Sequence, residues 1–414
     1  MKKTPSTTSK SSVSKDPEVK LLDEWTSKDS AAESYFIKKK ENRSSVGKLL
    51  IAIAFFFTIT TFVGAIAPHV VKVVIADESA HSMLNDDQKK HKKDVYEPVL
   101  PDYKIQPHKD IAEHKGFHSE VWHYKANLEG DDGLTYGLQW TVYRVSNSDI
   151  QATGWNNAQI YTSQVVISTE KHTWSQQRLS RGGIGQAGSM MYPFRLWLDD
   201  WSWVSSNNTA TPSELNVKTD DFSIHLKNTN YGKYILNGDQ GYRRTHDLMG
   251  SASYSFSAPY LESQGELNLN GRKVKVKGMA WLDKGWGNKL IADNSLRWDY
   301  FTIHLSDGRS LLLTQYHNEQ DMRYVSATLS DKNGGTIALS NEDIHIYPLE
   351  KTKLLSGRML PLNWVIEVSS QQIHLITHPI NNELWLPFWI PSWEGPINVE
   401  GSFSGQGFMQ LTGY

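Results

Sequence analysis

The sequence predicts an all-β protein whose antiparallel β-domains follow one N-terminal transmembrane helix. Short runs in which apolar and polar residues alternate recur from His118 to the end of the chain. Asn-Gly, Asp-Gly and Gly-Gly pairs separate these runs at short, regular spacing, and such pairs favour β-hairpin turns. Ahead of them stands one long segment without a formal charge, residues 49–71. Many short antiparallel strands are typical of barrels and sandwiches.

The expected strands begin with the alternating run 118–128, which the turn EGDDG joins to a partner strand at 136–143. Helical spacing after residue 71 is found only at 187–201. The β-rich part is too long for one eight-stranded barrel, so we expect two β-domains, 101–250 and 251–414. Further strands are expected at Phe222–Leu226, Tyr234–Leu236, Gly265–Leu269, Lys273–Trp281, Tyr300–Leu305, Ser310–Tyr316, Val325–Leu329 and Thr336–Leu339.

Residues 49–71 are long enough to cross the hydrocarbon core of a bilayer. Basic residues cluster on the N-terminal flank, so the positive-inside rule keeps the tail, residues 1–48, in the cytoplasm. We therefore expect a single-pass anchor in the inner (cytoplasmic) membrane, a charged linker at 72–100, and β-domains that are periplasmic or extracellular. A cleaved signal peptide is the alternative, but Pro68 and the long leader argue against it.

Composition excludes several classes of function. A net charge of −2 gives no support for nucleic acid as a partner. The chain has no cysteine, which removes disulfides, thiolate catalysis and thiolate metal sites. Its 15 tryptophans outnumber its 13 phenylalanines, and this excess suggests large amphipathic rings that line pockets or pack between sheets.

The segment GMAWLDKGWG, residues 278–287, is the strongest candidate site. It places Asp283 among Trp281, Trp286 and, if the next strand pairs with it, Trp298. Poor hydration raises the pKa of a carboxyl group, so Asp283 is a candidate general acid. Trp281 and Asp283 share a strand face. The structural alternative is that Asp283 caps turn amides or pairs with Lys284 or an arginine, while the tryptophans fill a core.

The strand that follows presents a second set of candidates. Trp298, Tyr300, Thr302 and His304 fall on one face, opposite a largely aliphatic one. This pattern fits a barrel wall with one side toward a ligand. His304 is a candidate base or water-positioning group, and a hydrogen-bonded surface histidine is the alternative.

Four histidines and two glutamates lie close together near the first strand, but they lack the spacing of a metal site. We therefore expect no metal and no cofactor. HSEVWHYKANL (118–128) is also one of the motifs that resemble a known family, and this resemblance implies that His118, Glu120 and Trp122 line the mouth of the first barrel as ligand-binding residues. The alternative is that Glu120 pairs with Arg144 and braces the barrel. Three further tryptophans, at 197, 201 and 203, form either a ligand-facing lip or simple packing.

Several motifs occur in an order that resembles a known family. They are HSEVWHYKANL (118–128), YGLQWTVYR (136–144), the stretch 251–287, WDYFTIHLSDGRSLLL (298–313) and SWEGPINVEGSFSGQGFMQLTGY (392–414). Together they resemble the lipocalin-like family that holds carotenoid 1,2-hydratases (hydroxyneurosporene synthases) and AttH-type proteins. The resemblance covers residues 110–414 and is specific because separate motifs keep their order.

The resemblance implies two tandem lipocalin-like (calycin-like) β-barrels that pack together, with a ligand cavity near their interface. In that family the Trp–Asp–Trp-Gly motif lies by the cavity, and catalytic members add water to polyene-like substrates or cyclise them. This chain has Gly285 where many relatives carry Glu or Gln. The departure removes a hydrogen-bonding side chain from the candidate site.

Three functions follow as expectations. The first is a membrane-anchored carrier that holds a hydrophobic, lipid- or isoprenoid-like ligand in an aromatic cavity, beside a membrane transporter. The second is a hydratase or cyclase in which Asp283 protonates an alkene and indole faces stabilise the developing cation. The third is a glycan-active β-protein that uses Asp283 and Glu120 as its carboxylate pair.

Overall fold

The computed structural model of the protein describes residues 96–146, 154–246, 251–288, 297–317 and 323–414. The expected cytoplasmic tail, the membrane anchor and the linker up to residue 95 lie outside these residues. Within the described ranges, no helix combines the length and the apolarity that a membrane crossing requires.

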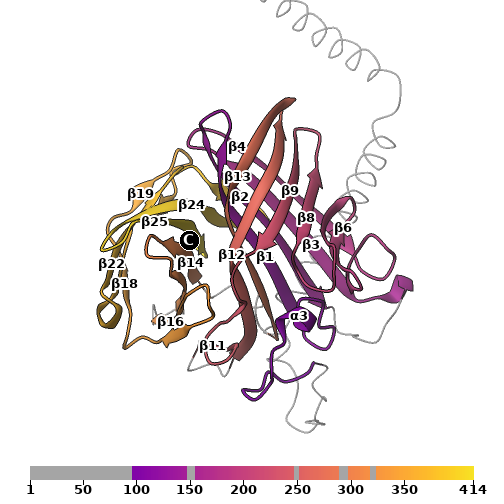
Figure 1. Cartoon of the computed structure of the whole chain (residues 1–414), viewed down its shortest axis with the longest axis horizontal. Coiled ribbons are helices and arrows are strands. Elements are labelled where there is room, and N and C mark those ends of the chain that lie inside the picture. Colours follow the sequence, from indigo (N-terminus) through magenta and orange to yellow (C-terminus); the bar gives the residue numbers. More distant parts are fainter. Residues whose placement is uncertain (1–95, 147–153, 247–250, 289–296, 318–322) are drawn as a thin grey trace, which may run out of the picture. The chain divides into compact units, whose positions relative to one another are not determined.

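The described part is all-β, as expected. Two large antiparallel sheets, each curled like a barrel, make up nearly all of it, the first nearly closed and the second closer to a half-barrel (Figure 1). Helix in these residues is confined to α3 (Pro107–Asp110) and the 3-10 turns η1 (Gly154–Asn156) and η2 (Ser369–Gln371). A small third sheet pairs β19 (Thr352–Lys353) with β20 (Met359–Leu360).

The first sheet has 13 strands, in the order β4-β3-β2-β1-β13-β12-β9-β8-β7-β6-β5, with β10 and β11 paired to β12. Its strands are β1 (Ser119–Gly130), β2 (Thr135–Ser146), β3 (Gln159–Ser168), β4 (Thr173–Arg181), β5 (Ala187–Met191), β6 (Phe194–Leu198), β7 (Trp201–Ser205), β8 (Ser213–Lys218), β9 (Phe222–Asn230), β10 (Ile235–Leu236), β11 (Tyr242–His246), β12 (Ser251–Leu269) and β13 (Arg272–Gly287).

The second sheet has 10 strands, in the order β17-β16-β15-β14-β25-β24-β22-β21-β18, with β23 paired to β24. Its strands are β14 (Arg297–Leu305), β15 (Ser310–His317), β16 (Arg323–Ser330), β17 (Thr336–Leu339), β18 (His345–Pro348), β21 (Trp364–Val368), β22 (Ile373–Pro379), β23 (Trp385–Leu386), β24 (Ser392–Gly401) and β25 (Gly405–Thr412).

Alternation along each strand builds one apolar core inside each sheet. In β1, the side chains of Trp122, Tyr124 and Ala126 belong to the core of the first sheet. The residues between them point to the other face, because successive side chains of a strand alternate. On the outer face of β2, Gly137 allows the second sheet to approach: a Cβ there would lie 2.4 Å from Cγ of Pro396.

Two expectations about the chain's organisation fail. Residues 187–201 form β5, β6 and the start of β7 instead of a helix. Pro193 lies between the first two of these strands, where it interrupts any helical run because it lacks an N–H donor. The change of sheet also falls after Gly287 and not at residue 250, since β12 and β13 pair within the first sheet. Local turn signals do not show which distant strand a hairpin joins.

Candidate functional site

Strand β13 separates the GMAWLDKGWG motif into two clusters, one on each face of the first sheet. Its register with β1 places Asp283 opposite His123 and Trp286 opposite Glu120. Trp281 and Asp283 face the second sheet, whereas Trp286 belongs to the interior core of the first. The expectation that Trp286 surrounds Asp283 is therefore wrong, because the two residues are an odd number of positions apart on a strand.

Asp283 is buried between the two sheets and accepts hydrogen bonds from four side chains. Its Oδ1 accepts from Trp281 Nε1 and from Ser257 Oγ, both at 2.6 Å. Its Oδ2 accepts from Lys125 Nζ at 2.6 Å and from Tyr300 Oη at 2.7 Å. These donors come from β13, β12, β1 and β14, so the carboxylate joins the two sheets.

The expected raised pKa of Asp283 is wrong. Burial by itself raises the pKa of this carboxyl group, but the charge of Lys125 and the hydrogen bonds outweigh burial, and the pKa is lowered. Asp283 is therefore an anion at neutral pH and does not hold a proton to donate. The structural alternative predicted an ion pair of Asp283 with Lys284 or an arginine. That partner is wrong, because the cation that pairs with Asp283 is Lys125.

A second buried pair lies beside Asp283. His123 Nε2 is 2.5 Å from a carboxylate oxygen of Glu394, which lies on β24 of the other sheet. The ring of Tyr300 stacks on His123 at 6.3 Å between centroids and lies 4.5 Å from Lys125 Nζ. Burial, followed by the charge of Lys125, lowers the pKa of His123, and burial together with Asp283 raises that of Tyr300.

Most of the residues predicted from the second motif join this cluster. The ring of His304 lies 5.3 Å from the indole of Trp281, and its Nε2 is 2.5 Å from the carbonyl oxygen of Pro259. His304 is half-buried, and burial lowers its pKa. Trp298 is half-buried on the same face of β14 as Tyr300. The structure thus brings together Trp281, Asp283, Tyr300 and His304.

The layer between the sheets also holds polar atoms that lack partners. Several side-chain atoms there are buried without a hydrogen bond to any described residue, although nearly all buried polar groups in proteins are hydrogen-bonded. Both sheets contribute to this set. The atoms are Asn127 Oδ1, Gln139 Oε1, Asn237 Oδ1, Ser326 Oγ and Thr412 Oγ1.

The inner face of the same strands carries a closed ionic cluster. Glu120 is fully buried and lies 3.1 Å from Arg144 Nη2 and 2.5 Å from Lys284 Nζ. These two cations hold the pKa of Glu120 far below its usual range despite burial. Burial, together with the nearby charge of Arg144, lowers the pKa of Lys284 to about 8. Lys284 Nζ lies 3.4 Å from the ring centroid of Trp122.

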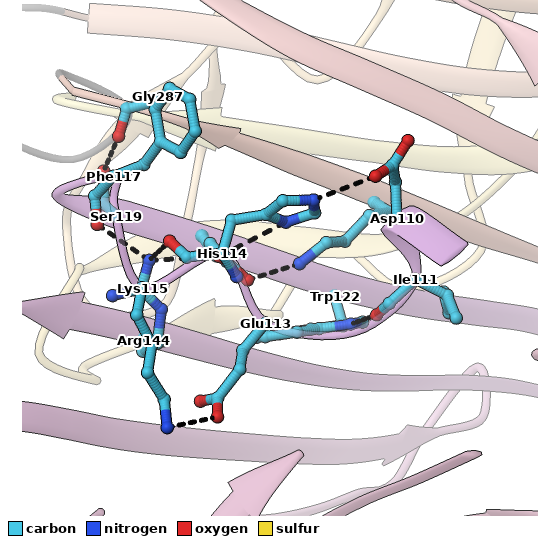
Figure 2. Close-up of polar contacts among 12 residues, drawn as sticks. Asp110, Ile111, Glu113, His114, Lys115, Phe117, Ser119, Trp122, Arg144 and Gly287 are labelled. Carbon is cyan, nitrogen blue, oxygen red and sulfur yellow. Dashed lines mark hydrogen bonds and ion pairs between the residues drawn. The ribbon is translucent and has the colours of Figure 1, made fainter. Parts of the chain in front are cut away.

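This inner cluster holds residues 106–117, here called the N-terminal strap, against the first sheet (Figure 2). Trp122 Nε1 donates to the carbonyl of Ile111 at 2.7 Å. Arg144 Nη2 donates to the carbonyls of His114 and Phe117, both at 2.9 Å. The ring of His114 stacks on the indole of Trp286 at 4.2 Å. Trp122, Arg144 and Trp286 together therefore fix the strap to the first sheet.

These contacts place the remaining predicted residues. The alternative in which Glu120 pairs with Arg144 is confirmed. The side chains of Glu120, Trp122 and Trp286 all contact other residues of the protein itself. His118 lies just before β1, where its ring meets Tyr96 edge-on at 5.1 Å. Because Glu120 and Asp283 lie on opposite faces of the sheet, they cannot form the carboxylate pair of a glycan-active site.

The sequence-based prediction missed the polar partners of Asp283. His123 and Lys125 alternate with the core residues of the first strand, so their shared outward face was a usable signal. Glu394 and Ser257 gave no such signal, since each becomes a neighbour only through pairing of distant strands.

Comparison with known proteins supports one family. The AttH-like family model matches residues 98–414. A structure described as an AttH protein from Nitrosomonas europaea is similar at a TM-score of 0.68 and 24% identity, covering 77% of this chain and 99% of that chain. The structure of kievitone hydratase from Nectria haematococca is similar at a TM-score of 0.58 and 13% identity, covering 77% of this chain and 96% of that chain. No functionally curated protein matches the sequence. The chain belongs to the AttH-like family, the group of lipocalin-like proteins that its motifs resemble.

Proposed function

We propose that this protein binds a hydrophobic, lipid- or isoprenoid-like small molecule in the layer between its two sheets, beside Asp283. The observation that carries this proposal is the coexistence there of aromatic side chains with buried polar atoms that lack partners. Ligand sites are typically apolar and aromatic, with a few polar groups that fix orientation. Between the two sheets, such atoms give a bound molecule groups with which to pair.

Each part of the layer has a separate role in this proposal. The rings of Trp281 and Tyr300 contact the apolar body of the ligand. Asp283 is already satisfied by four donors, so it holds these rings and Lys125 in place. The polar end of the ligand then pairs with unsatisfied groups such as Asn127 and Gln139. An uncompensated buried polar group costs about 1–3 kcal/mol, which gives the ligand's polar end a defined position.

We further propose that residues 49–71 anchor the protein in the cytoplasmic membrane, with the β-domains exported. The uncharged segment and its basic N-terminal flank support this proposal. A carrier at that surface would deliver its ligand to or from a transporter. Cell fractionation tests the anchor: removal of residues 49–71 is expected to release residues 95–414 in soluble form without detergent. A shortened chain that stays in the membrane fraction would contradict it.

A hydratase or cyclase is the second candidate. What favours it is the group of buried residues with displaced pKa values, which is common in active sites. In this version Asp283, as an anion, serves as a base or as a water-positioning group and not as the acid. Tyr300 is then the proton-bearing group that contacts it.

One experiment separates the two candidates. The full chain is purified, extracted with organic solvent, and the extract is analysed by mass spectrometry. A carrier is expected to release a lipid or isoprenoid, and Asp283→Asn is expected to retain it. An enzyme with that variant is expected to keep its ligand and lose turnover. The binding proposal fails if the wild-type chain neither releases nor takes up an apolar molecule.

A further inference from the structure

A cavity lies at the rim of the first sheet, away from the layer around Asp283. It has a volume of about 210 Å³ and lies where the sheet is nearly closed between β4 and β5. The N-terminal strap supplies one wall through Glu113 and Lys115. The start of β3, the glycine-rich segment 182–189 and the indole of Trp197 supply the others.

Missing side chains keep this cavity open. At Gly182, a Cβ would lie 3.1 Å from Cβ of Gln159 and 3.1 Å from Cε2 of Tyr161, so a larger residue would project into the space. Gly183 has a φ of +82°, and a Cβ there would lie 2.5 Å from Cβ of Asn157. The glycines therefore preserve a small space that ordinary side chains would fill.

The charges that face the cavity cancel. The carboxylate of Glu113 accepts a hydrogen bond from the hydroxyl of Tyr161 and lies 3.0 Å from Lys115 Nζ. An anionic ligand would meet this carboxylate, and a cationic one would have to displace Lys115. An apolar ligand would leave the polar walls without partners, which is unfavourable. The cavity therefore suits a neutral polar ligand.

Two side chains define the shape and the polarity that such a ligand needs. Ser189 Oγ is buried and has no hydrogen-bond partner among the described residues. The indole of Trp197 is fixed by its Nε1, which donates to the carbonyl of Gly185 at 2.9 Å, and it offers a flat apolar wall. We propose that this cavity binds one ring of a neutral polyhydroxylated ligand, a sugar or a cyclitol. Its hydroxyl groups would pair with Ser189 and Glu113 while its apolar edge contacts Trp197.

The test is a titration of the full chain by calorimetry and ligand-observed NMR. The probes are glucose, N-acetylglucosamine and myo-inositol, with glucose 6-phosphate and glucosamine as charged counterparts. At least one neutral ring is expected to bind more tightly than the charged compounds. Methyl glycosides and short oligosaccharides, added in parallel, distinguish a free ring from the terminal ring of a glycan; binding of either supports the proposal.

A matched pair of variants places the binding in this cavity. Ser189→Ala is expected to weaken binding about tenfold while leaving Tm unchanged or higher, because it removes an unsatisfied buried hydroxyl. Ser213→Ala removes another buried, unpartnered hydroxyl of the first sheet, on β8, and is expected to leave binding unchanged. Ser189→Leu fills the space and is expected to abolish binding. The proposal is overturned if no neutral ring binds, or if the three variants bind alike.

Discussion

The two faces of β13 carry two buried carboxylate clusters that differ in which parts of the protein they hold together. On the inner face, Glu120 is held by Arg144 and Lys284, and the cluster fixes the N-terminal strap. On the outer face, Asp283 joins the two sheets, and other buried polar atoms of the same layer lack partners.

The difference shows which cluster is structural and which is a candidate site. Removing one partner of a buried ion pair is costly because it leaves an uncompensated charge. The inner cluster has this character, and its rings contact the protein's own chain. The inner cluster also leaves Arg144 Nε and Trp286 Nε1 without hydrogen-bond partners, but on residues that hold the strap. The unpartnered atoms of the outer layer lie between the two sheets, where the proposed ligand would pair with them.

The largest effect is expected from Glu120→Gln. It leaves Arg144 and Lys284 buried without their carboxylate, so the free energy of unfolding should fall by about 3–5 kcal/mol in chemical denaturation. The control is Glu266→Gln, which breaks an exposed pair with Lys273 and should cost less than about 1 kcal/mol. Equal losses in the two variants would show that the inner cluster does not hold the strap.

Asp283→Asn is expected to cost less, about 2–3 kcal/mol, because the amide keeps one acceptor while Lys125 loses its counter-charge. The lowered pKa of Asp283 means that its charge stabilises the fold above the unfolded-state value of about 4. This stability is lost as pH falls through the folded-state pKa. Denaturation curves at several pH values should therefore show the two proteins converging only in acid. Convergence already at neutral pH would mean that Asp283 is protonated there.

Lys284→Met should change stability at pH 7 by about 1 kcal/mol or less, because Arg144 still neutralises Glu120. Its distinctive effect is at alkaline pH. The folded-state pKa of Lys284 is about 8, below its unfolded value of about 10.4, so the unfolded state holds more protons between these values. Wild-type stability should therefore gain a contribution that rises with pH across this window and is missing in the variant. Parallel pH profiles of the two proteins would be inconsistent with this assignment.

Gly285→Gln is expected to have the smallest effect on stability, under about 1 kcal/mol. A Cβ at Gly285 would lie 3.4 Å from Cγ1 of Val121 and 3.6 Å from the carbonyl oxygen of Tyr254, both ordinary contacts. The new amide would enter the layer beside Asp283 and should alter ligand retention. Gly278→Gln on the same strand is the control, because its Cβ would lie 2.0 Å from the carbonyl oxygen of Asn127 and should prevent folding. A severe loss from Gly285→Gln would show that the outer layer has no room there.

The sequence predicted local features of the fold and of the site well. Turn pairs marked the hairpins, and alternation correctly placed Trp281 with Asp283 and Tyr300 with His304. The pairing of β1 with β13 was beyond such reasoning, because it depends on packing between residues far apart in the chain. The raised pKa expected for Asp283 failed for this reason: nothing in residues 278–287 indicates that Lys125 lies on the adjacent strand.

The most direct test of the account is mass spectrometry of the molecules that co-purify with the full chain and with two variants. Trp281→Ala alters the layer between the sheets, and Trp122→Phe alters the inner cluster. With thermal melts confirming that both variants fold, we expect an apolar molecule from the wild type and from Trp122→Phe, and at least about tenfold less from Trp281→Ala. Retention by Trp281→Ala together with loss from Trp122→Phe would place the ligand inside the first sheet and contradict the account.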